Sequence, residues 1–191
     1  MPLRRLPVLF FLVPSLIALA PAHAQTVVRV APFRSVALEG GGHVVLRNGN
    51  VQQVRLLKGD PALTRFRVRD DGQLRIEACN DNCPSRYDLE IEITTPAIDA
   101  LAISGGGAID VSGGLPCRPG FALAVDGGGT IDSRAMRCAQ ATVAVNGGGV
   151  VRVSAAHRLT AAVHGGGTIK YWGNPELTQA IDGGGEVKQG R

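Results

Sequence analysis

Two aspartates, Asp110 and Asp132, are the residues of this sequence best suited to acid–base chemistry. Each follows the first glycine of a Gly-Gly-Gly triplet by five positions, so stacked repeats would bring the two to about 5 Å. That separation suits a retaining glycosidase, and repulsion between the two charges would raise the pKa of one of them. Both side chains could instead be solvated, with Asp132 paired to Arg152. A glycosidase or polysaccharide lyase is therefore the enzymatic alternative for this chain.

Aromatic side chains, which line the grooves of carbohydrate enzymes, are scarce: the chain has 5 Phe, 2 Tyr and 1 Trp. We therefore expect no catalytic residues, and a protein that binds a partner or provides structure. The candidate surface contacts are a histidine, two lysines and an aromatic pair, namely His164, Lys170, Lys188, Tyr171 and Trp172. Two interpretations of Trp172 are open, an exposed contact or an aromatic packed on the last repeat.

His164 belongs to a ladder of polar residues that precede the glycine triplets, Glu39, Ser104, Asp126, Asn146, His164 and Asp182. A histidine beside a carboxylate can serve as a base or as a pH-sensitive contact, or it can simply be hydrogen-bonded. The other histidines are not near His164 in register. The sequence therefore predicts no metal site and no cofactor.

The four cysteines form two pairs. Cys79 and Cys83 close a short polar loop, whereas Cys117 and Cys138 lie 12 and 11 residues after the first glycine of their repeats. Equivalent positions on adjacent parallel strands are about 5 Å apart, within reach of a disulfide. We expect disulfides 79–83 and 117–138, as befits an exported protein with an even cysteine count. The alternative is a zinc site, for which the loop lacks a neighbouring histidine.

Six segments share one pattern, an aliphatic strand followed by Gly-Gly-Gly and a second strand. The first glycines fall at 40, 105, 127, 147, 165 and 183, at intervals of 65, 22, 20, 18 and 18. Apolar and polar residues alternate with period two on both sides, which indicates strands. We predict an all-β fold, a right-handed parallel β-helix with coils of about 18–22 residues. The middle glycines are expected to be its structural corners: Gly106, Gly128, Gly148, Gly166 and Gly184.

The 65-residue interval between the first two triplets follows a different pattern. Two alternating segments, Phe66–Val68 and Leu74–Ile76, flank a turn at Asp70–Gln73, which is typical of a hairpin. A third strand pattern runs from Leu89 to Pro96. We expect strands with tight turns over residues 26–96 that cap the regular repeats.

Residues 1–24 have the pattern of a secretory signal peptide, with Arg4 and Arg5 before an apolar stretch and Ala22-His23-Ala24 before the cleavage point. Cleavage leaves 18 basic residues (20 minus 2) against 16 acidic ones, a net charge of +2. This weak, scattered charge predicts no nucleic-acid binding. We expect one domain over 25–191, located in the periplasm or secreted to the surface of a bacterium, with no transmembrane segment after cleavage.

Two motifs, Ser-Gly-Gly-Gly-Ala-Ile-Asp from Ser104 and Asp-Gly-Gly-Gly-Thr-Ile-Asp from Asp126, together with Tyr171-x-Gly173-x-Pro175, carry a family resemblance. The chain resembles the head GIN domain family, described as auto-transporter adhesins, from Phe33 to Gly185. The resemblance implies an exported bacterial β-solenoid-like domain with no established catalytic residues. Its partner would be an envelope glycan, an envelope protein or another copy of itself.

Overall fold

The computed structural model describes residues 26–79, 83–84 and 87–191, and within them all regular structure is β. The predicted signal peptide lies outside the described residues. The strands are β1 (Thr26–Val28), β2 (Ser35–Gly40), β3 (His43–Asn48), β4 (Gln53–Lys58), β5 (Arg65–Val68), β6 (Gln73–Glu77), β7 (Glu90–Thr95), β8 (Ile98–Gly105), β9 (Ala108–Ser112), β10 (Cys117–Gly127), β11 (Thr130–Gly147), β12 (Val150–Gly165), β13 (Thr168–Trp172), β14 (Glu176–Asp182) and β15 (Glu186–Gln189). The all-β prediction is confirmed.

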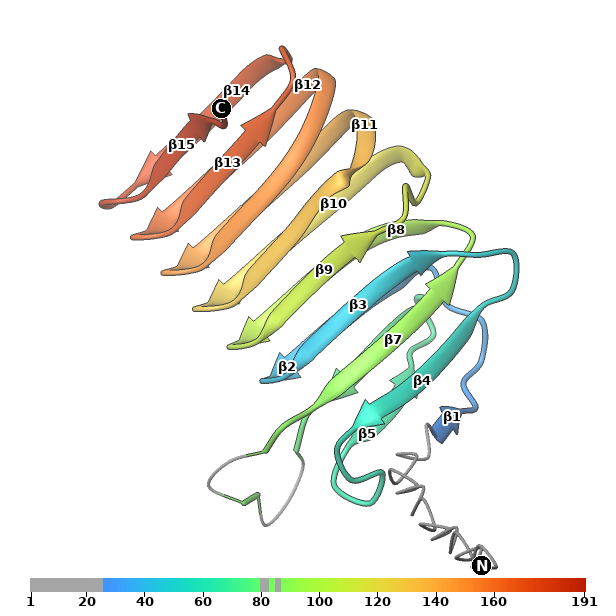
Figure 1. Cartoon of the computed structure of the whole chain (residues 1–191). Coiled ribbons are helices and arrows are strands. Elements are labelled where there is room, and N and C mark those ends of the chain that lie inside the picture. The colour runs from blue at the N-terminus through green and yellow to red at the C-terminus, as the bar shows by residue number, and fades with distance from the viewer. Residues whose placement is uncertain (1–25, 80–82, 85–86) are drawn as a thin grey trace, which may run out of the picture.

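The 15 strands form one sheet in which successive repeats stack side by side (Figure 1). We call the two strands that flank one glycine triplet a layer. Strands that precede the triplets pair in a first ladder, β5-β6-β2-β8-β10-β11-β12-β14, and strands that follow them pair in a second, β1-β4-β7-β3-β9-β11-β12-β13-β15. The early residues of β11 and β12 belong to the second ladder and their late residues to the first. From β2 and β3 onward, neighbouring layers pair in parallel and in the predicted register, for example Gly127 opposite Gly147.

The segment between the first two triplets adds a further layer instead of lengthening a loop. Strand β6 pairs with β2 in the first ladder, and β7 pairs with β3 in the second. The predicted hairpin is confirmed, because β5 and β6 pair antiparallel with Val68 opposite Leu74. On the second ladder, β4 and β1 add two antiparallel strands beyond β7. The N-terminal end of the sheet is therefore closed by antiparallel strands, whereas its C-terminal end consists of β14 and β15 in parallel pairing.

Alternation along each strand places one apolar row of each ladder in a continuous core. Ile103, Val125 and Val145 occupy one row, each at most 2% exposed. The equivalent row of the second ladder contains Ile109, Ile131, Val151 and Ile169, all at 0% exposure. Apolar burial of this kind is the main stabilising term of folding. The outward positions of the same strands are free to vary without disturbing this core.

The sequence predicted that the middle glycine of each triplet is the structural corner, but the structure constrains other glycines of the triplet. The first glycine of each triplet from Gly105 onward has a left-handed φ, and a Cβ there would come within 2.6–2.9 Å of the carbonyl oxygen of the preceding layer. The predicted corner glycines, Gly128, Gly148, Gly166 and Gly184, have no atom within 4 Å of such a Cβ, and for Gly106 the nearest is Gly40 O at 3.5 Å. The last four of these middle glycines are exposed at the tips of the turns, and Gly106 is half-buried. The first glycine must therefore lack a side chain because of the neighbouring backbone. The third glycine, from Gly129 onward, must lack one because a Cβ there would come within 2.3–2.5 Å of an Ile or Val side chain.

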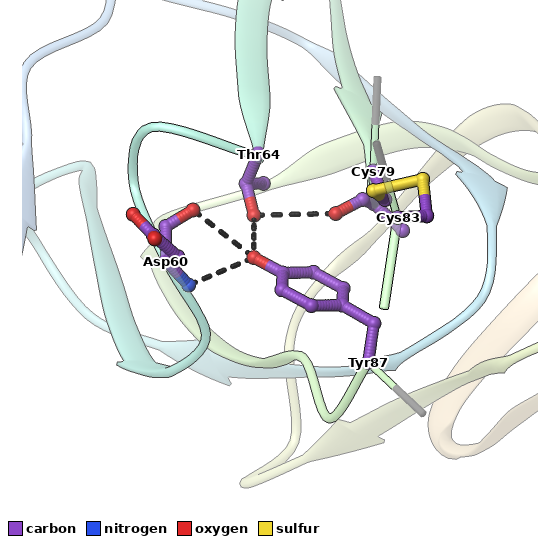
Figure 2. The surroundings of a disulfide bond; sticks show 6 residues. Asp60, Thr64, Cys79, Cys83 and Tyr87 are labelled. Atoms are coloured by element: carbon purple, nitrogen blue, oxygen red, sulfur yellow. Dashed lines mark hydrogen bonds between the residues drawn. A yellow bond between two sulfur atoms is a disulfide. The ribbon is translucent and has the colours of Figure 1, made fainter. Parts of the chain in front are cut away.

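Both predicted disulfides are confirmed. Cys117 and Cys138, on neighbouring layers, have Cα atoms 5.1 Å apart, and Cys79 and Cys83 have theirs 5.8 Å apart. Polar contacts beside the short loop, which were not predicted from the sequence, centre on Tyr87 (Figure 2). The Tyr87 hydroxyl lies 2.6 Å from Thr64 Oγ1 and accepts a hydrogen bond from the Asp60 backbone N–H at 2.8 Å. These contacts fasten the loop after β4 to the segment that leaves the disulfide.

Candidate functional site

The most ordered array of charges lies on the outer face of the second ladder. One outward residue of each layer stands directly opposite its neighbours, giving the series Asp110, Asp132, Arg152, Lys170 and Lys188, which we call the charged column. The register of β9, β11, β12, β13 and β15 places these side chains on successive strands, about 4.8 Å apart. The predicted proximity of Asp110 to Asp132 is present, and Lys170 and Lys188, two of the predicted surface contacts, stand next to each other in the column.

The two carboxylates of the column are each engaged by a partner. Asp110 Oδ2 lies 2.7 Å from His43 Nε2, and Arg134 contacts Asp132 with Nη2–Oδ2 at 2.6 Å and Nε–Oδ1 at 2.9 Å. Burial acts to raise the pKa of Asp132, but hydrogen bonds from the Arg134 side chain and backbone, together with the charges of Arg134 and Arg152, outweigh it. The pKa of Asp132 is therefore lowered, and its carboxylate stays ionised.

This arrangement does not suit the acid–base pair of a glycosidase. A retaining enzyme needs one carboxyl group that is protonated near neutral pH and free to reach the glycosidic oxygen. Asp132 is ionised and held by a bidentate arginine, and the Asp110 carboxylate contacts His43. Arg134 and His43 were missed by the sequence analysis. Arg134 could have been found from its position two residues after Asp132 on the same strand, which places both side chains on one side of the backbone.

The basic residues at the C-terminal end of the column have fewer oppositely charged partners than the two aspartates. Within the described residues, neither Arg152 nor Lys170 forms an ion pair, and Lys188 contacts Glu186 on its own strand. Arg152 and Lys170 are half-buried, so their stems lie along the sheet and their charged groups reach solvent. The face is therefore neutralised by local partners at Asp110, Asp132 and Lys188, and it is positive at Arg152 and Lys170.

Trp172 borders this positive region from the end of β13. The guanidinium carbon of Arg134 lies 5.0 Å from the centre of its ring, a cation–π contact that joins the aromatic to the charged column. The ring also packs against Gly190, where a Cβ would come within 2.2 Å of it, and its Nε1–H donates to the Arg191 carbonyl at 3.3 Å. Trp172 is therefore half-buried against the last layer, and part of its ring reaches the surface, where it lines a hollow.

A shallow hollow of about 230 Å³ lies beside this edge. It is lined by Arg137, Cys138, Ser154, Ala155, Ala156, Trp172 and Gly173. Tyr171 was predicted as a second surface contact, but its half-buried side chain packs against the apolar core instead. The alternation of β13 explains this correction, since Lys170 and Trp172 point outward and the residue between them points inward.

The predicted polar ladder lies on the first ladder of strands. His164 stands opposite Asn146 and Asp182, as predicted, and its Nδ1 lies 2.9 Å from Asp182 Oδ2. Both side chains are largely exposed, at 73% and 82%. No group of three or more metal-ligating side chains occurs in the described part of the chain. His164 is therefore a surface residue in contact with an exposed carboxylate, and it lies away from the charged column.

A family described as "Putative auto-transporter adhesin, head GIN domain" matches residues 32–116 and 120–175, which is most of the chain. The chain belongs to the head GIN domain family. The match covers most of the layers from β2 to β13, including the Cys79–Cys83 disulfide, Arg134 and Trp172, and leaves out residues 117–119. The resemblance noted in the sequence is therefore confirmed, and no curated protein matches the chain.

Two of the solved structures that match the chain have the following descriptions. A putative adhesin from Bacteroides fragilis NCTC 9343 is 17% identical, with a TM-score of 0.54 and coverage of 86% of this chain and 95% of that chain. A putative cell adhesion protein from Clostridium sporogenes ATCC 15579 is 10% identical, with a TM-score of 0.42 and coverage of 87% and 99%. The first of these supports a shared fold for this head GIN domain. In the described residues, no helix is long and apolar enough to cross a membrane.

Proposed function

We propose that this head GIN domain is an exported, non-catalytic binding protein of the bacterial envelope, and that it holds an extended acidic glycan along the basic end of the charged column. The observation that carries the proposal is the unbalanced charge of that column. Arg152 and Lys170 stand side by side without ion-pair partners in the described residues, while Asp132 is neutralised by Arg134. A polyanion laid across the strands would meet one basic group per layer.

Trp172 suits the same ligand. Its accessible edge and the adjacent hollow offer an apolar surface on which a sugar ring could pack, while Arg137 in the lining of the hollow supplies a positive charge. Electrostatic attraction would recruit the polymer and the aromatic would add contact area. Adhesin descriptions of the family and of the Bacteroides fragilis protein agree with a binding role. The glycosidase alternative gains no support from the engaged carboxylates.

The proposal includes an architecture and a location. We infer that the stack is a right-handed parallel β-helix, which is supported by the parallel, in-register ladders and by the general right-handedness of parallel crossovers. A single domain over 25–191, released by cleavage of residues 1–24, would carry it. The two disulfides support an oxidising compartment, the periplasm or the cell surface.

Calorimetric titration of the processed protein with polygalacturonate, and with neutral dextran in parallel, tests the proposed function. We expect binding of the acidic polymer only, weakening as salt is raised. Arg152→Ala or Lys170→Ala should each weaken binding about two- to fivefold, and the double variant about tenfold, the range expected for exposed charge contacts. Lys170→Arg should retain binding.

Lys58→Ala is the matched control, because Lys58 is an exposed lysine of the same ladder that is paired with Glu90 at 2.9 Å. The control should bind as the parent does. Equal affinity for dextran, or an equal loss in the Lys58 variant, would refute the assignment of the site. Release of reducing ends from polygalacturonate that disappears in Asp132→Asn would instead establish the enzymatic alternative.

A further inference from the structure

The apolar core is uncovered at the C-terminal end of the sheet. Along the inward row of the first ladder, Val145 and Val163 are at most 2% exposed, but Ile181 on β14 is 42% exposed. Its counterpart on the second ladder is Val187 on β15, which stands opposite Ile169 and is only half-buried. Within the described residues, both strands have a paired neighbour on one side only (Figure 1). An edge with exposed apolar side chains and free backbone groups is a template for a further strand.

The backbone groups of Val187 and Ile181 face this open edge. On β15, the N–H groups of Glu186 and Gly190 donate to the preceding layer at 2.9 and 2.8 Å. Successive residues of a strand direct these groups to alternate sides, so those of Val187 point away from β13. On the first ladder, the middle glycine of a triplet donates to the preceding layer, as Gly166 does at 3.0 Å. Ile181 lies three positions before the middle glycine of its own triplet, and this odd spacing turns its backbone groups to the open edge as well.

We propose that two copies of this protein pair through their C-terminal ends around a two-fold axis, with β14 antiparallel to β14 of the second copy and β15 antiparallel to β15. Ile181 and Val187 lie three residues before and three residues after Gly184, so one axis can pass through both strands at the same distance from the corner. Both strands belong to the last layer, and each ends its ladder there. Each of the two residues would then meet its own copy, exchange two backbone hydrogen bonds and cover the open apolar row.

The side chains around this axis are self-complementary. Antiparallel pairing about Val187 sets Glu186 opposite Lys188 of the second copy, and the two-fold axis makes this opposite-charge pair twice. The same two residues already form an ion pair within β15, which is exposed and easily exchanged for the pair between copies. Pairing about Ile181 sets Asp182 opposite Ala180, a small neutral residue. No like charges are therefore directly opposed in this register.

The N-terminal end of the sheet has a different shape. There β1 extends the second ladder one strand beyond β5, so the two ladders end at different levels. The outward residues of β5 include the exposed arginines Arg65 and Arg67, and charged side chains of this kind protect an edge strand from pairing. A copy stacked head to tail could therefore not pair with both ladders at once. Two-fold pairing uses the C-terminal end alone, and such a contact closes at two copies.

Sedimentation velocity of the processed protein over a wide concentration range tests the pairing. We expect the weight-average mass to rise from one copy to two and to stop there, and because two short strands make a small interface the exchange should be reversible. Ile181→Lys should abolish dimerisation, since it places a charge in the covered row. Val51→Lys, which changes an exposed valine in the turn between β3 and β4, is the matched control and should dimerise as the parent does. Melting curves verify that each variant is folded.

Charge reversal on β15 tests the register. Glu186→Lys and Lys188→Glu should each weaken dimerisation about tenfold, because two attractive pairs become two repulsive ones. An equimolar mixture of these two variants should form the mixed dimer about as tightly as the parent, because its interface regains two opposite pairs. Rescue in the mixture cannot come from a change within one chain.

The pairing does not rest on the proposed glycan binding. It is measured without polymer, and Lys170→Ala, which should weaken glycan binding, should leave dimerisation unchanged, so the two proposals can fail separately. A protein that stays monomeric at every concentration, or a mass that grows past two copies, would overturn the two-fold pairing. A mixture of the charge variants without rescue would overturn its register.

Discussion

The sharpest test of the stacked corners compares two adjacent glycines, Gly147 and Gly148. At Gly147 an alanine Cβ would lie 2.8 Å from the carbonyl oxygen of Gly127, and φ is +102°. A left-handed φ costs a residue with a side chain about 1–2 kcal/mol, and crowding against backbone that cannot move aside adds about 1–3 kcal/mol. We therefore expect Gly147→Ala to lower the free energy of unfolding by about 2–5 kcal/mol.

Gly148→Ala is the matched control, one residue further along the same turn. An added Cβ there meets nothing within 4 Å, and no left-handed φ is required. Its effect should stay within about 0.5 kcal/mol, as for ordinary surface positions. The two variants carry the same Gly→Ala change at adjacent positions, so the effect of the substitution on the unfolded state is the same in both and cancels in the comparison.

Equilibrium urea unfolding with the disulfides intact, followed by circular dichroism, measures the difference. For an m-value of about 2 kcal/mol/M, the midpoint of Gly147→Ala should fall by about 1–2.5 M, and that of Gly148→Ala should remain close to the parent. Equal midpoints for the two variants, or a larger loss at Gly148, would refute the assignment of the constraint to the first glycine of each triplet.

Two further predictions concern the cross-links and the charged column. Replacing Cys117 and Cys138 by alanine should lower the free energy of unfolding by about 3 kcal/mol, and replacing Cys79 and Cys83 by about 2 kcal/mol, because the first disulfide closes the longer loop. The urea midpoints of the two double variants measure this order of stability. A larger loss in the Cys79/Cys83 variant would contradict the prediction. Arg134→Ala should raise the pKa of Asp132, followed by carboxyl-carbon NMR, since burial then acts with less opposition. In the parent, the pKa of Asp132 is lower in the folded state than in the unfolded state. The stability that Asp132 supplies is therefore present at neutral pH and is lost as the pH falls through the folded-state pKa. Asp132→Asn should not show this loss. An Asp132 pKa that is unchanged in Arg134→Ala would contradict this explanation.

The glycine-triplet repeat makes much of the fold predictable from the amino-acid sequence. Because each triplet has the same flanking alternation, one alignment of the repeats places Asp110 beside Asp132, Lys170 beside Lys188, and Cys117 within reach of Cys138. Register is strongly determined in such a stack, since a slip of one residue would expose an entire apolar row. The same alignment predicts the position of His164 between Asn146 and Asp182.

Features that depend on close packing are not predictable in this way. All three glycines of a triplet are the same residue type, so the sequence does not distinguish the one whose Cβ would strike a neighbouring carbonyl from the one at the open tip. The contact of Arg134 with Trp172 depends on side-chain rotamers and joins two residues that are 38 positions apart in the chain. The Tyr87 cluster joins segments of the N-terminal region that lie outside the repeat.

The separation of core and surface rows explains how one architecture can carry a local binding site. In the second ladder the inward row stays apolar through Ile109, Ile131, Val151 and Ile169, while the outward residue next to each changes from Asp110 and Asp132 to Arg152 and Lys170. Because outward substitutions leave the inward packing intact, the sign of the surface charge can change between adjacent layers at little cost to stability. The acidic layers then require local partners, His43 and Arg134, and the layers without such partners present their charge to solvent. The proposed binding face is accordingly confined to the C-terminal layers, and it needs neither a cleft nor an inserted loop.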